Sequence, residues 1–388
     1  MSSQYVLDRG SSLRRVSVAK SKSKSHILRR IDWLLILVTI SIAAFGDLII
    51  YSVTKPLLIA SGLGPTVDLV HQGIYIAIGI VVMAVVMSID YHKLERFVPL
   101  AYFGLVTMLL LVMTPIGSSA LGSQRWFSLG PFQLQPSAFT SLVLILVMSS
   151  YLAQTQGTIG LKKLISALVM AFIPMILVVI QPDLGTAIIA GFTVLVMLVV
   201  GGIKGKHLFA LFVLAIVGAY LVITLGLLHH YQLQRLTSFL HNGNQSTTGY
   251  NLTQSKITIG SGGLHGKGLF QGPQTNGGYV PAQGTDFIFT AVGEQFGFIG
   301  TASLVSGFAI LLWRIWSAAM LAKDKLGTLM VAGVFGLIGV SVFQNIGMTI
   351  GLMPITGIPL PFLSYGGSAI IAFFAAIGLV LNIRMRRM

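Results

Sequence analysis

Cysteine is absent from this chain of 388 residues, and charged residues make up only 9% of it. The lack of cysteine excludes a disulfide framework, thiolate chemistry and cysteine-ligated metal. A soluble domain of this length carries about 25% charged residues, so the shortage of charge excludes a soluble globular protein. The eight histidines are scattered without metal-ligand spacing and indicate no metal site. Apolar residues make up 54% of the chain. The sequence therefore predicts an all-α, polytopic membrane protein.

Ten apolar segments are long enough to cross a bilayer, which takes about 20 helical residues. We place them at residues 32–53, 71–89, 98–114, 137–154, 164–181, 185–202, 207–228, 286–313, 328–352 and 366–383. The fifth and sixth are separated only by residues 181–186, as in a broken helical hairpin. The chain thus divides into a basic tail (1–31), a ten-helix membrane domain (32–383) and a short tail (384–388). The first tail has no apolar core of its own, so we expect no cleavable signal peptide.

The distribution of Lys and Arg predicts the orientation of these helices. If the N-terminus is cytoplasmic, 20 of the 25 Lys and Arg residues lie on the cytoplasmic side, as the positive-inside rule requires. Both termini are then cytoplasmic, and the large loop between helices seven and eight (229–285) is extracytoplasmic. A basic inner rim facing anionic membrane lipid accounts for the net charge of +15, so we expect no nucleic-acid partner.

Asp286 directly follows the large loop, which contains no other carboxylate. An ionisable group at a membrane edge is energetically expensive, so Asp286 is a candidate functional residue. The predicted topology places the other candidates on the same, extracytoplasmic face. They are Arg125 and Trp126 in the third-to-fourth loop, Asp183 in the fifth-to-sixth turn, Gln254, Lys256 and Lys267 in the large loop, and Ser364 and Tyr365 in the last loop.

This combination suits an amphiphile that bears phosphate. Arg125, Lys256 and Lys267 can neutralise a pyrophosphate, which Arg can bind bidentately. Backbone N–H groups of the glycine-rich segment 260–268 can approach phosphate oxygens closely. Asp286 can act as a general base on a sugar hydroxyl. Because ATP and sugar nucleotides are absent from the outer face, synthesis there requires a lipid-linked, preactivated donor.

Several of these features also have a structural interpretation. Asp286 and Asp183 can each be the N-cap of the helix that follows. Arg125 and Trp126 can anchor the chain at the membrane interface, and the glycine-rich segment can be a flexible loop. Glu294 lies about 12 Å along the helix from Asp286 and fits a structural polar contact.

A set of motifs lies along the chain in a recognisable order and spacing. They are Arg125-Trp126, residues 181–186, Gln254-Ser255, residues 260–268, Gln274, residues 285–289 and residues 345–369. These motifs resemble those of the SEDS proteins (shape, elongation, division and sporulation), and the resemblance extends over nearly the whole chain after residue 28. Residues 30–33 and the short termini resemble the elongation branch of the family more than the division branch.

The resemblance implies a peptidoglycan glycosyltransferase that polymerises lipid II at the outer face of the cell membrane and releases undecaprenyl pyrophosphate. It implies that Asp286, in the Thr-Asp-Phe motif, is the essential residue. The implied partner is a class B penicillin-binding protein, a transpeptidase, within the elongation machinery. A divalent cation such as Mg²⁺ or Mn²⁺ is compatible with a pyrophosphate donor, although the sequence assigns no ligands to it.

The chain departs from the family pattern at several charged positions. Ala138 and Ser141 replace a Glu and a Lys at the start of helix four, Ala282 replaces a Glu, and Gln295 replaces the second Glu of a pair. These losses favour one alternative, a non-catalytic relative that binds and activates a transpeptidase. A second alternative is a lipid-precursor flippase, which needs polar groups across the bilayer. Asp47 is the main intramembrane candidate, and we expect it to have a buried partner.

Overall fold

The computed structural model describes residues 31–120, 123–130, 132–155, 157–224, 226 and 247–387. Residues 1–30 of the predicted tail lie outside this part of the chain. So do residues 227–228 at the end of the seventh predicted span and residues 229–246 of the large loop, including Arg235.

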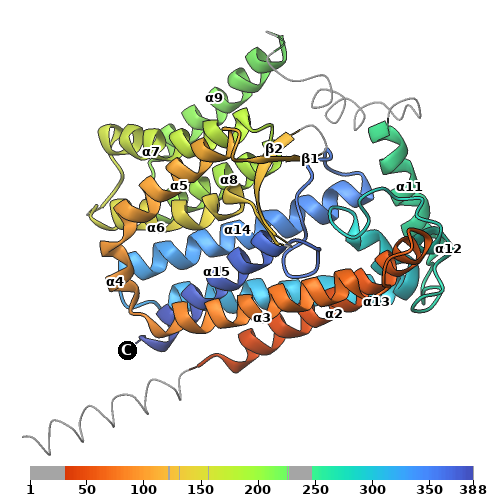
Figure 1. Ribbon diagram of the computed structural model, residues 1–388. Helices are drawn as coiled ribbons and strands as arrows, with labels where there is room; N and C mark the ends of the chain where they lie inside the picture. The colour runs from red at the N-terminus through yellow and green to blue at the C-terminus, as the bar shows by residue number, and fades with distance from the viewer. Residues whose placement is uncertain are drawn as a thin grey trace, which may run out of the picture.

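Helices account for most of the described chain (Figure 1). Seven of them are long and apolar enough to cross a membrane, and three shorter apolar helices occupy the other predicted positions. The polytopic helical fold is therefore confirmed, while the count of ten spans stays a prediction. The helices are α2 (Trp33–Ala60), α3 (Val67–Ser88), α4 (Tyr91–Arg96), α5 (Val98–Val112), α6 (Thr140–Ala153), α7 (Leu161–Ile180), α8 (Leu184–Val200), α9 (Gly205–Thr224), α11 (Thr247–Ser261), α12 (Pro273–Asn276), α13 (Ile288–Met320), α14 (Lys325–Ile350) and α15 (Gly367–Met385), with a 3₁₀ turn η1 (Pro136–Phe139) before α6.

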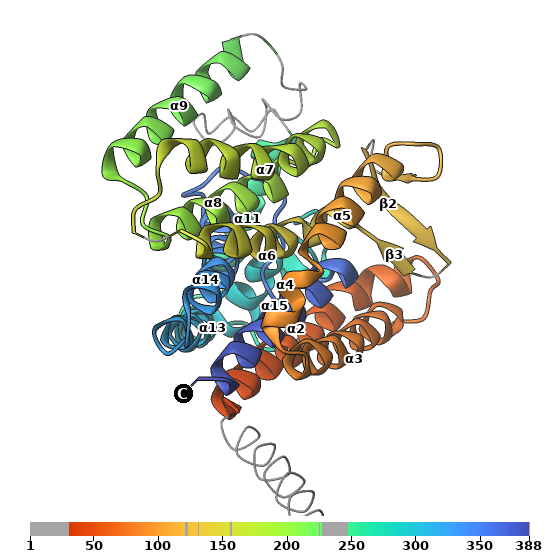
Figure 2. The same ribbon diagram turned by 90° about the vertical axis from the view of Figure 1, so that its left-hand side faces the viewer.

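A small antiparallel sheet, which the sequence did not predict, lies between α5 and η1. Its strands are β1 (Ser118–Ala120), β2 (Ser123–Leu129) and β3 (Phe132–Leu134), in the order β1-β2-β3. Figure 2 shows the sheet at one side of the helix bundle. Because β2 contains Arg125 and Trp126, the sheet determines where these two candidate residues lie.

The centre of the bundle is formed by α14 and α15. Helix α15 is buried along nearly its whole length and packs mainly on α3, while α14 packs on α6, α8 and α13. Gly378 allows α15 to approach α3 closely, because a Cβ atom there would lie 2.7 Å from the carbonyl oxygen of Met83. In a membrane, such small residues permit close backbone contact between helices.

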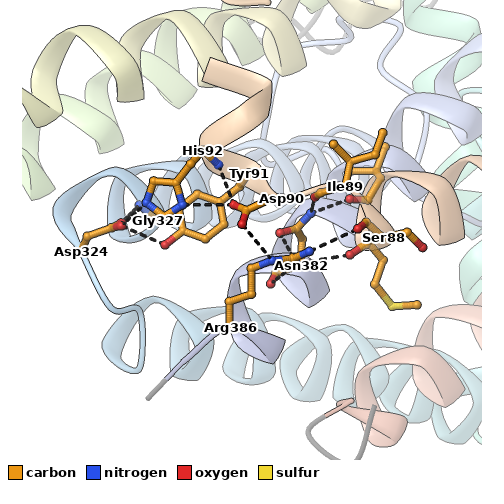
Figure 3. Close-up of polar contacts among 11 residues, drawn as sticks. Ser88, Ile89, Asp90, Tyr91, His92, Asp324, Gly327, Asn382 and Arg386 are labelled. Carbon is orange, nitrogen blue, oxygen red and sulfur yellow. Dashed lines mark hydrogen bonds and ion pairs between the residues drawn. The ribbon is translucent and has the colours of Figure 1, made fainter. Parts of the chain in front are cut away.

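One end of the bundle gathers the basic segments, as predicted. Asp32 forms ion pairs with Arg314 and Arg384, so that the ends of α2, α13 and α15 meet. Arg386 reaches the turn between α3 and α4, where it pairs with Asp90 and binds the side chain of Asn382 (Figure 3). The segments 155–163 and 203–206 lie at the same end, because Lys325 binds the carbonyl of Thr155 and residues 159 and 203 form a β-bridge. We call this the basic end.

Candidate functional site

The α14–α15 loop (residues 351–366) turns back into the bundle at the end opposite the basic end. Residues 360–364 are all buried. The loop backbone presses on neighbouring helices at glycines: a Cβ on Gly46 of α2 would lie 2.6 Å from the carbonyl oxygen of Leu363, and a Cβ on Gly185 of α8 would lie 2.6 Å from that of Thr356. Non-helical backbone is tolerated at membrane depth where protein surrounds it. The loop is therefore packed tightly against α2 and α8, and the candidate site lies beside it.

Asp286 lies in a tight turn (residues 282–287, the Asp286 turn) just before α13. Ala282 adopts a left-handed φ of 54°, and its carbonyl accepts hydrogen bonds from the N–H groups of Thr285 and Phe287. The N-cap of α13 is Phe287, so the interpretation of Asp286 as a helix cap is wrong. Asp286 itself is half-buried. The turn therefore presents an acid at the start of a helix without using it as the cap.

Ser364 and Tyr365 contact the Asp286 turn through its backbone. The hydroxyl of Ser364 donates to the carbonyl of Thr285 at 2.5 Å, and the backbone N–H of Tyr365 donates to the carbonyl of Gly284 at 2.9 Å. Burial, together with the charge of Asp68, raises the pKa of Tyr365 to about 12. Its phenol is therefore protonated at neutral pH and remains a hydrogen-bond donor.

The glycine-rich segment 260–268 packs against a break in α13. Gly297 interrupts that helix with φ 65° and ψ −159°. The N–H groups of Lys267 and Gly268 donate to the carbonyls of Glu294 and Gln295, which the break frees. The carbonyls of residues 263 and 264 accept in turn from the N–H groups of residues 298 and 299.

This packing corrects two predictions about the segment. A Cβ on Gly262 would lie 2.0 Å from the carbonyl oxygen of Gly293, and one on Gly266 would lie 2.2 Å from that of Gln295. The glycines are thus required for contact with α13, and the backbone N–H groups of residues 266–268 already donate within the protein. Neither a phosphate cradle formed by these amides nor a flexible loop fits this geometry.

Glu294 is fully buried and makes a structural contact, as predicted. Its carboxylate accepts hydrogen bonds from the N–H groups of Gln274 and Thr275, at 2.8 Å each, and from the hydroxyl of Thr275 at 2.6 Å. The side-chain amide of Gln283 then joins the hydroxyls of Thr275 and Thr290. These bonds fasten the segment that precedes the Asp286 turn onto α13.

Arg125 and Asp183 belong to a second cluster, at the start of α8. Arg125 donates from Nε to the carbonyl of Gln181 at 2.8 Å and from Nη2 to that of Pro182. Asp183 is the N-cap of α8, which confirms its structural interpretation, and accepts from the hydroxyl of Ser137 at 3.0 Å. With these contacts Asp183 is almost wholly buried. Binding of substrate by these two side chains stays a prediction.

The α14–α15 connection links the two clusters. The hydroxyl of Ser368, at the start of α15, accepts from the backbone N–H of Gln135, whose side-chain amide in turn binds Asp183. Trp126 lies nearby on β2 and is half-buried, and its carbonyl accepts from the hydroxyl of Ser118. The Asp286 turn and the cluster of Arg125 and Asp183 therefore lie at one end of the bundle and are joined by the α14–α15 connection.

The remaining candidates lie on or beside α11. Lys256 is exposed, and its Cε and Nζ atoms pass over Gly351 at the end of α14, where a Cβ would lie 2.3 Å from Cε. The neighbouring Ser255 donates to the carbonyl of Thr349 at 2.6 Å and so fixes α11 on α14. Gln254 is half-buried on α11, and the side chain of Lys267 is exposed beside the break in α13.

Two polar residues at the site escaped prediction as functional candidates. Asn345 on α14 donates to the carbonyl of Asp286, and Lys55 on α2 lies over the rings of Tyr51 and Phe270. The sequence could have indicated Asn345, because an amide side chain within an apolar membrane helix forms hydrogen bonds to neighbouring helices. Within the described residues, no group of three His, Cys, Asp or Glu side chains is arranged to hold a metal ion.

Comparison with known proteins places this fold in a family. Residues 32–388 match the family of FtsW, RodA and SpoVE, described as "Cell cycle protein". The chain belongs to this family. The FtsW/RodA/SpoVE family is the one that the motifs predicted under the name SEDS.

Relatives in this family match over almost their full length. The peptidoglycan glycosyltransferase MrdB of Escherichia coli K12 is 34% identical over 361 residues, covering 92% of this chain and 94% of MrdB. A probable peptidoglycan glycosyltransferase FtsW of Geobacter sp. M18 is 33% identical over 364 residues, covering 92% of this chain and 97% of that protein.

Solved structures share the FtsW/RodA/SpoVE fold. A chain from a study of polymerization and crosslinking by a peptidoglycan synthase complex aligns with a TM-score of 0.77 and 28% identity, over 91% of this chain and 97% of that one. The rod shape determining protein RodA of Thermus thermophilus aligns with a TM-score of 0.68 and 27% identity, over 92% of this chain and 97% of RodA.

Proposed function

We propose that this protein is a peptidoglycan glycosyltransferase that polymerises lipid II into glycan strands during cell elongation and shape maintenance. The observation that carries the proposal is the Asp286 turn, a half-buried acid held by the α14–α15 loop at the end of the bundle where the predicted cations lie. The names of the relatives, which extend over nearly the whole chain, support the same activity.

In this proposal Asp286 is the general base. Its carboxylate accepts the proton of the acceptor 4-hydroxyl on a GlcNAc unit, and the freed oxygen attacks the anomeric carbon of the donor. The C–O bond to the pyrophosphate breaks as the new glycosidic bond forms, and undecaprenyl pyrophosphate leaves. A correctly placed general base contributes about 10²- to 10⁴-fold in rate.

The leaving pyrophosphate requires positive charge. Lys256 and Lys267 have exposed side chains and are the cations we assign to it. Arg125 donates from two of its nitrogens to carbonyls of the chain, so we assign it a supporting role through the α7–α8 turn. A divalent cation, if one is used, would take oxygen ligands from the pyrophosphate, because hard cations prefer oxygen.

We place the active face outside the cell. The support is the separation of charge: the segments rich in Lys and Arg are joined by ion pairs at the basic end, while Asp286 belongs to the other end. The positive-inside rule assigns the basic end to the cytoplasm.

Polymerisation of labelled lipid II by the purified protein tests the role of Asp286. Asp286→Asn keeps the size of the side chain and removes the base, and should lose about 10²-fold or more in rate. Glu95→Gln, which changes an acid on α4 at the basic end and keeps an oxygen that can accept from the hydroxyl of Ser150, is the matched control and should retain activity. Equal product from the wild type and Asp286→Asn would refute the assigned role.

We further propose that a class B transpeptidase of the elongation machinery is the partner. The support is the structural likeness to a chain from a study of a peptidoglycan synthase complex. The absence of the family Glu and Lys at Ala138 and Ser141 keeps a non-catalytic activator as the alternative. Complementation of an elongation-defective strain by Asp286→Asn would favour that alternative, and failure of this variant to complement would favour catalysis.

A further inference from the structure

Three successive carbonyls in the Asp286 turn each accept a hydrogen bond from outside the turn. The carbonyl of Gly284 accepts from the N–H of Tyr365, that of Thr285 from the hydroxyl of Ser364, and that of Asp286 from the side-chain amide of Asn345 at 2.8 Å. The donors come from α14 and from the α14–α15 loop. The position of the acid is thus set through its main chain.

Asn345 connects the two elements that supply these donors. It is fully buried, and its Nδ2 atom also donates to the carbonyl of Ile358 in the loop, at 2.7 Å. One amide group therefore holds both the loop and the residue that carries the acid. A buried donor of this kind is costly to lose, because the carbonyls it satisfies would be left without a partner in a water-poor interior.

The loop itself is arranged to present Ser364. The hydroxyl of Ser364 accepts a hydrogen bond from the backbone N–H of Leu360 at 2.8 Å while it donates to Thr285 at 2.5 Å. Both partners of this hydroxyl are backbone groups, and Ser364 is buried. This geometry differs from that of a side chain that binds substrate directly, which is the role that the sequence suggested.

We propose that Asn345 and Ser364 are positioning residues that hold the main chain of Asp286 so that its carboxylate meets the acceptor hydroxyl. This inference rests on the proposed function of Asp286. Effective general-base catalysis needs the acid within hydrogen-bond reach of the proton it accepts, and a displacement of about 1 Å can cost about 10²-fold in rate. The three carbonyl contacts tie the turn to α14 and to the α14–α15 loop.

The chain offers a matched control for Asn345. Gln344, its neighbour on α14, is also a buried amide, and its Nε2 atom donates to the carbonyl of Pro354 in the same loop at 2.9 Å. Gln344→Leu therefore removes a bond from α14 to the loop and leaves the Asp286 turn untouched. Asn345→Leu removes the bond to the loop and the bond to Asp286 together.

The test is steady-state polymerisation of lipid II, with thermal unfolding measured on each purified variant. Asn345→Leu and Ser364→Ala should lower kcat about 10- to 100-fold while KM for lipid II changes less than about twofold. Ser364→Thr, which keeps the hydroxyl, should restore most of kcat. Gln344→Leu should keep kcat near that of the wild type, even if its unfolding temperature falls as much as that of Asn345→Leu.

Three outcomes would overturn the inference. The first is a higher KM at unchanged kcat in Ser364→Ala, which would show direct substrate binding. The second is an equal loss of kcat in Gln344→Leu and Asn345→Leu, which would show a role in loop stability alone. The third is an inactive Asp286→Asn beside a fully active Asn345→Leu. An active Asp286→Asn would instead refute the proposed function itself.

Discussion

The Nε2 atom of His92 lies 2.8 Å from Oδ2 of Asp324, and this contact joins the start of α4 to the start of α14 (Figure 3). The other ring nitrogen of His92 lies 3.1 Å from Oδ1 of Asp90. The hydroxyl of Tyr91 also reaches Asp324, at 2.9 Å. The basic end of the bundle is therefore held by a cluster of titratable groups from two connections that are far apart in sequence.

This cluster predicts a loss of stability at low pH. Burial raises the pKa of Asp90, but hydrogen bonds from His92 and the charge of Arg386 outweigh it and hold that pKa below its ordinary value. A lowered pKa in the folded state means that Asp90 stabilises the fold above its unfolded pKa, about 3.9, and loses this effect as the pH falls through the folded value. Asp90→Asn should unfold at a lower temperature than the wild type at pH 7.

The difference in unfolding temperature between the wild type and Asp90→Asn should shrink below about pH 4, as thermal unfolding in detergent would show. Asp68→Asn, outside the cluster, serves as the control. A difference that stays constant from pH 7 to pH 3 would contradict the assigned role of the Asp90 carboxylate.

A second prediction concerns the buried ion pairs of Asp32. Its carboxylate faces two guanidinium groups, those of Arg314 and Arg384, and only 1% of the side chain is exposed. Asp32→Asn removes the one negative charge and leaves two partly buried cations facing each other, which should cost about 3–5 kcal/mol. Chemical or thermal unfolding measures the loss, with Lys206→Met, at an exposed position, as the control. Similar stabilities of the two variants would rule out the ion pairs as a major support.

Much of the fold could be predicted from composition and charge, because both follow from the membrane itself. The lengths of the apolar segments predicted where the helices lie. The Lys and Arg counts predicted which connections share one side of the membrane, and ion pairs join several of these connections at the basic end. The break at Gly297 could not be predicted, because glycines also lie within α14, as at Gly333 and Gly336, without interrupting that helix. The glycine-rich segment supplies hydrogen-bond partners for the backbone groups that the break frees. This is a tertiary contact, which the sequence around Gly297 does not reveal.

The sequence predicted the types of residue at the candidate site better than it predicted the role of each residue. Asp286 followed from the expense of a lone acid at a membrane edge. Ser364 and Arg125 were predicted to bind substrate, and the structure adds that both donate to backbone carbonyls of the chain. Substrate binding by Arg125 stays a prediction. Sequence patterns identify polar groups, but the partner of each group depends on how the α14–α15 loop enters the bundle.

The carboxylate of Glu294 gives a third prediction. It accepts three hydrogen bonds from Gln274 and Thr275, all in a buried position. Glu294→Gln replaces one accepting oxygen by a donor that faces other donors, which should cost about 1–3 kcal/mol. Hydrogen exchange should then be faster at the amides of residues 274–276, whereas the amides of α15 should exchange as in the wild type. Unchanged exchange at residues 274–276 would show that these bonds do not hold the segment.

The last prediction compares Gly262 with Gly260, two residues before it in the sequence. A Cβ on Gly262 would lie 2.0 Å from the carbonyl oxygen of Gly293, so Gly262→Ala must push α11 away from the first part of α13. A Cβ on Gly260 would meet nothing within 4 Å, and Ala is the better helix former by about 1 kcal/mol. Gly260→Ala is therefore the control that adds the same methyl group without a clash.

Gly262→Ala should lower the unfolding temperature and the rate of lipid II polymerisation together, because the first part of α13 begins directly after the Asp286 turn. Overpacking of this kind costs about 1–3 kcal/mol. Gly260→Ala should unfold at the same or a higher temperature and keep its rate. If both variants polymerise at the wild-type rate, close contact between the glycine-rich segment and α13 does not determine where Asp286 lies, and the contacts from α14 and the α14–α15 loop are sufficient to position the acid.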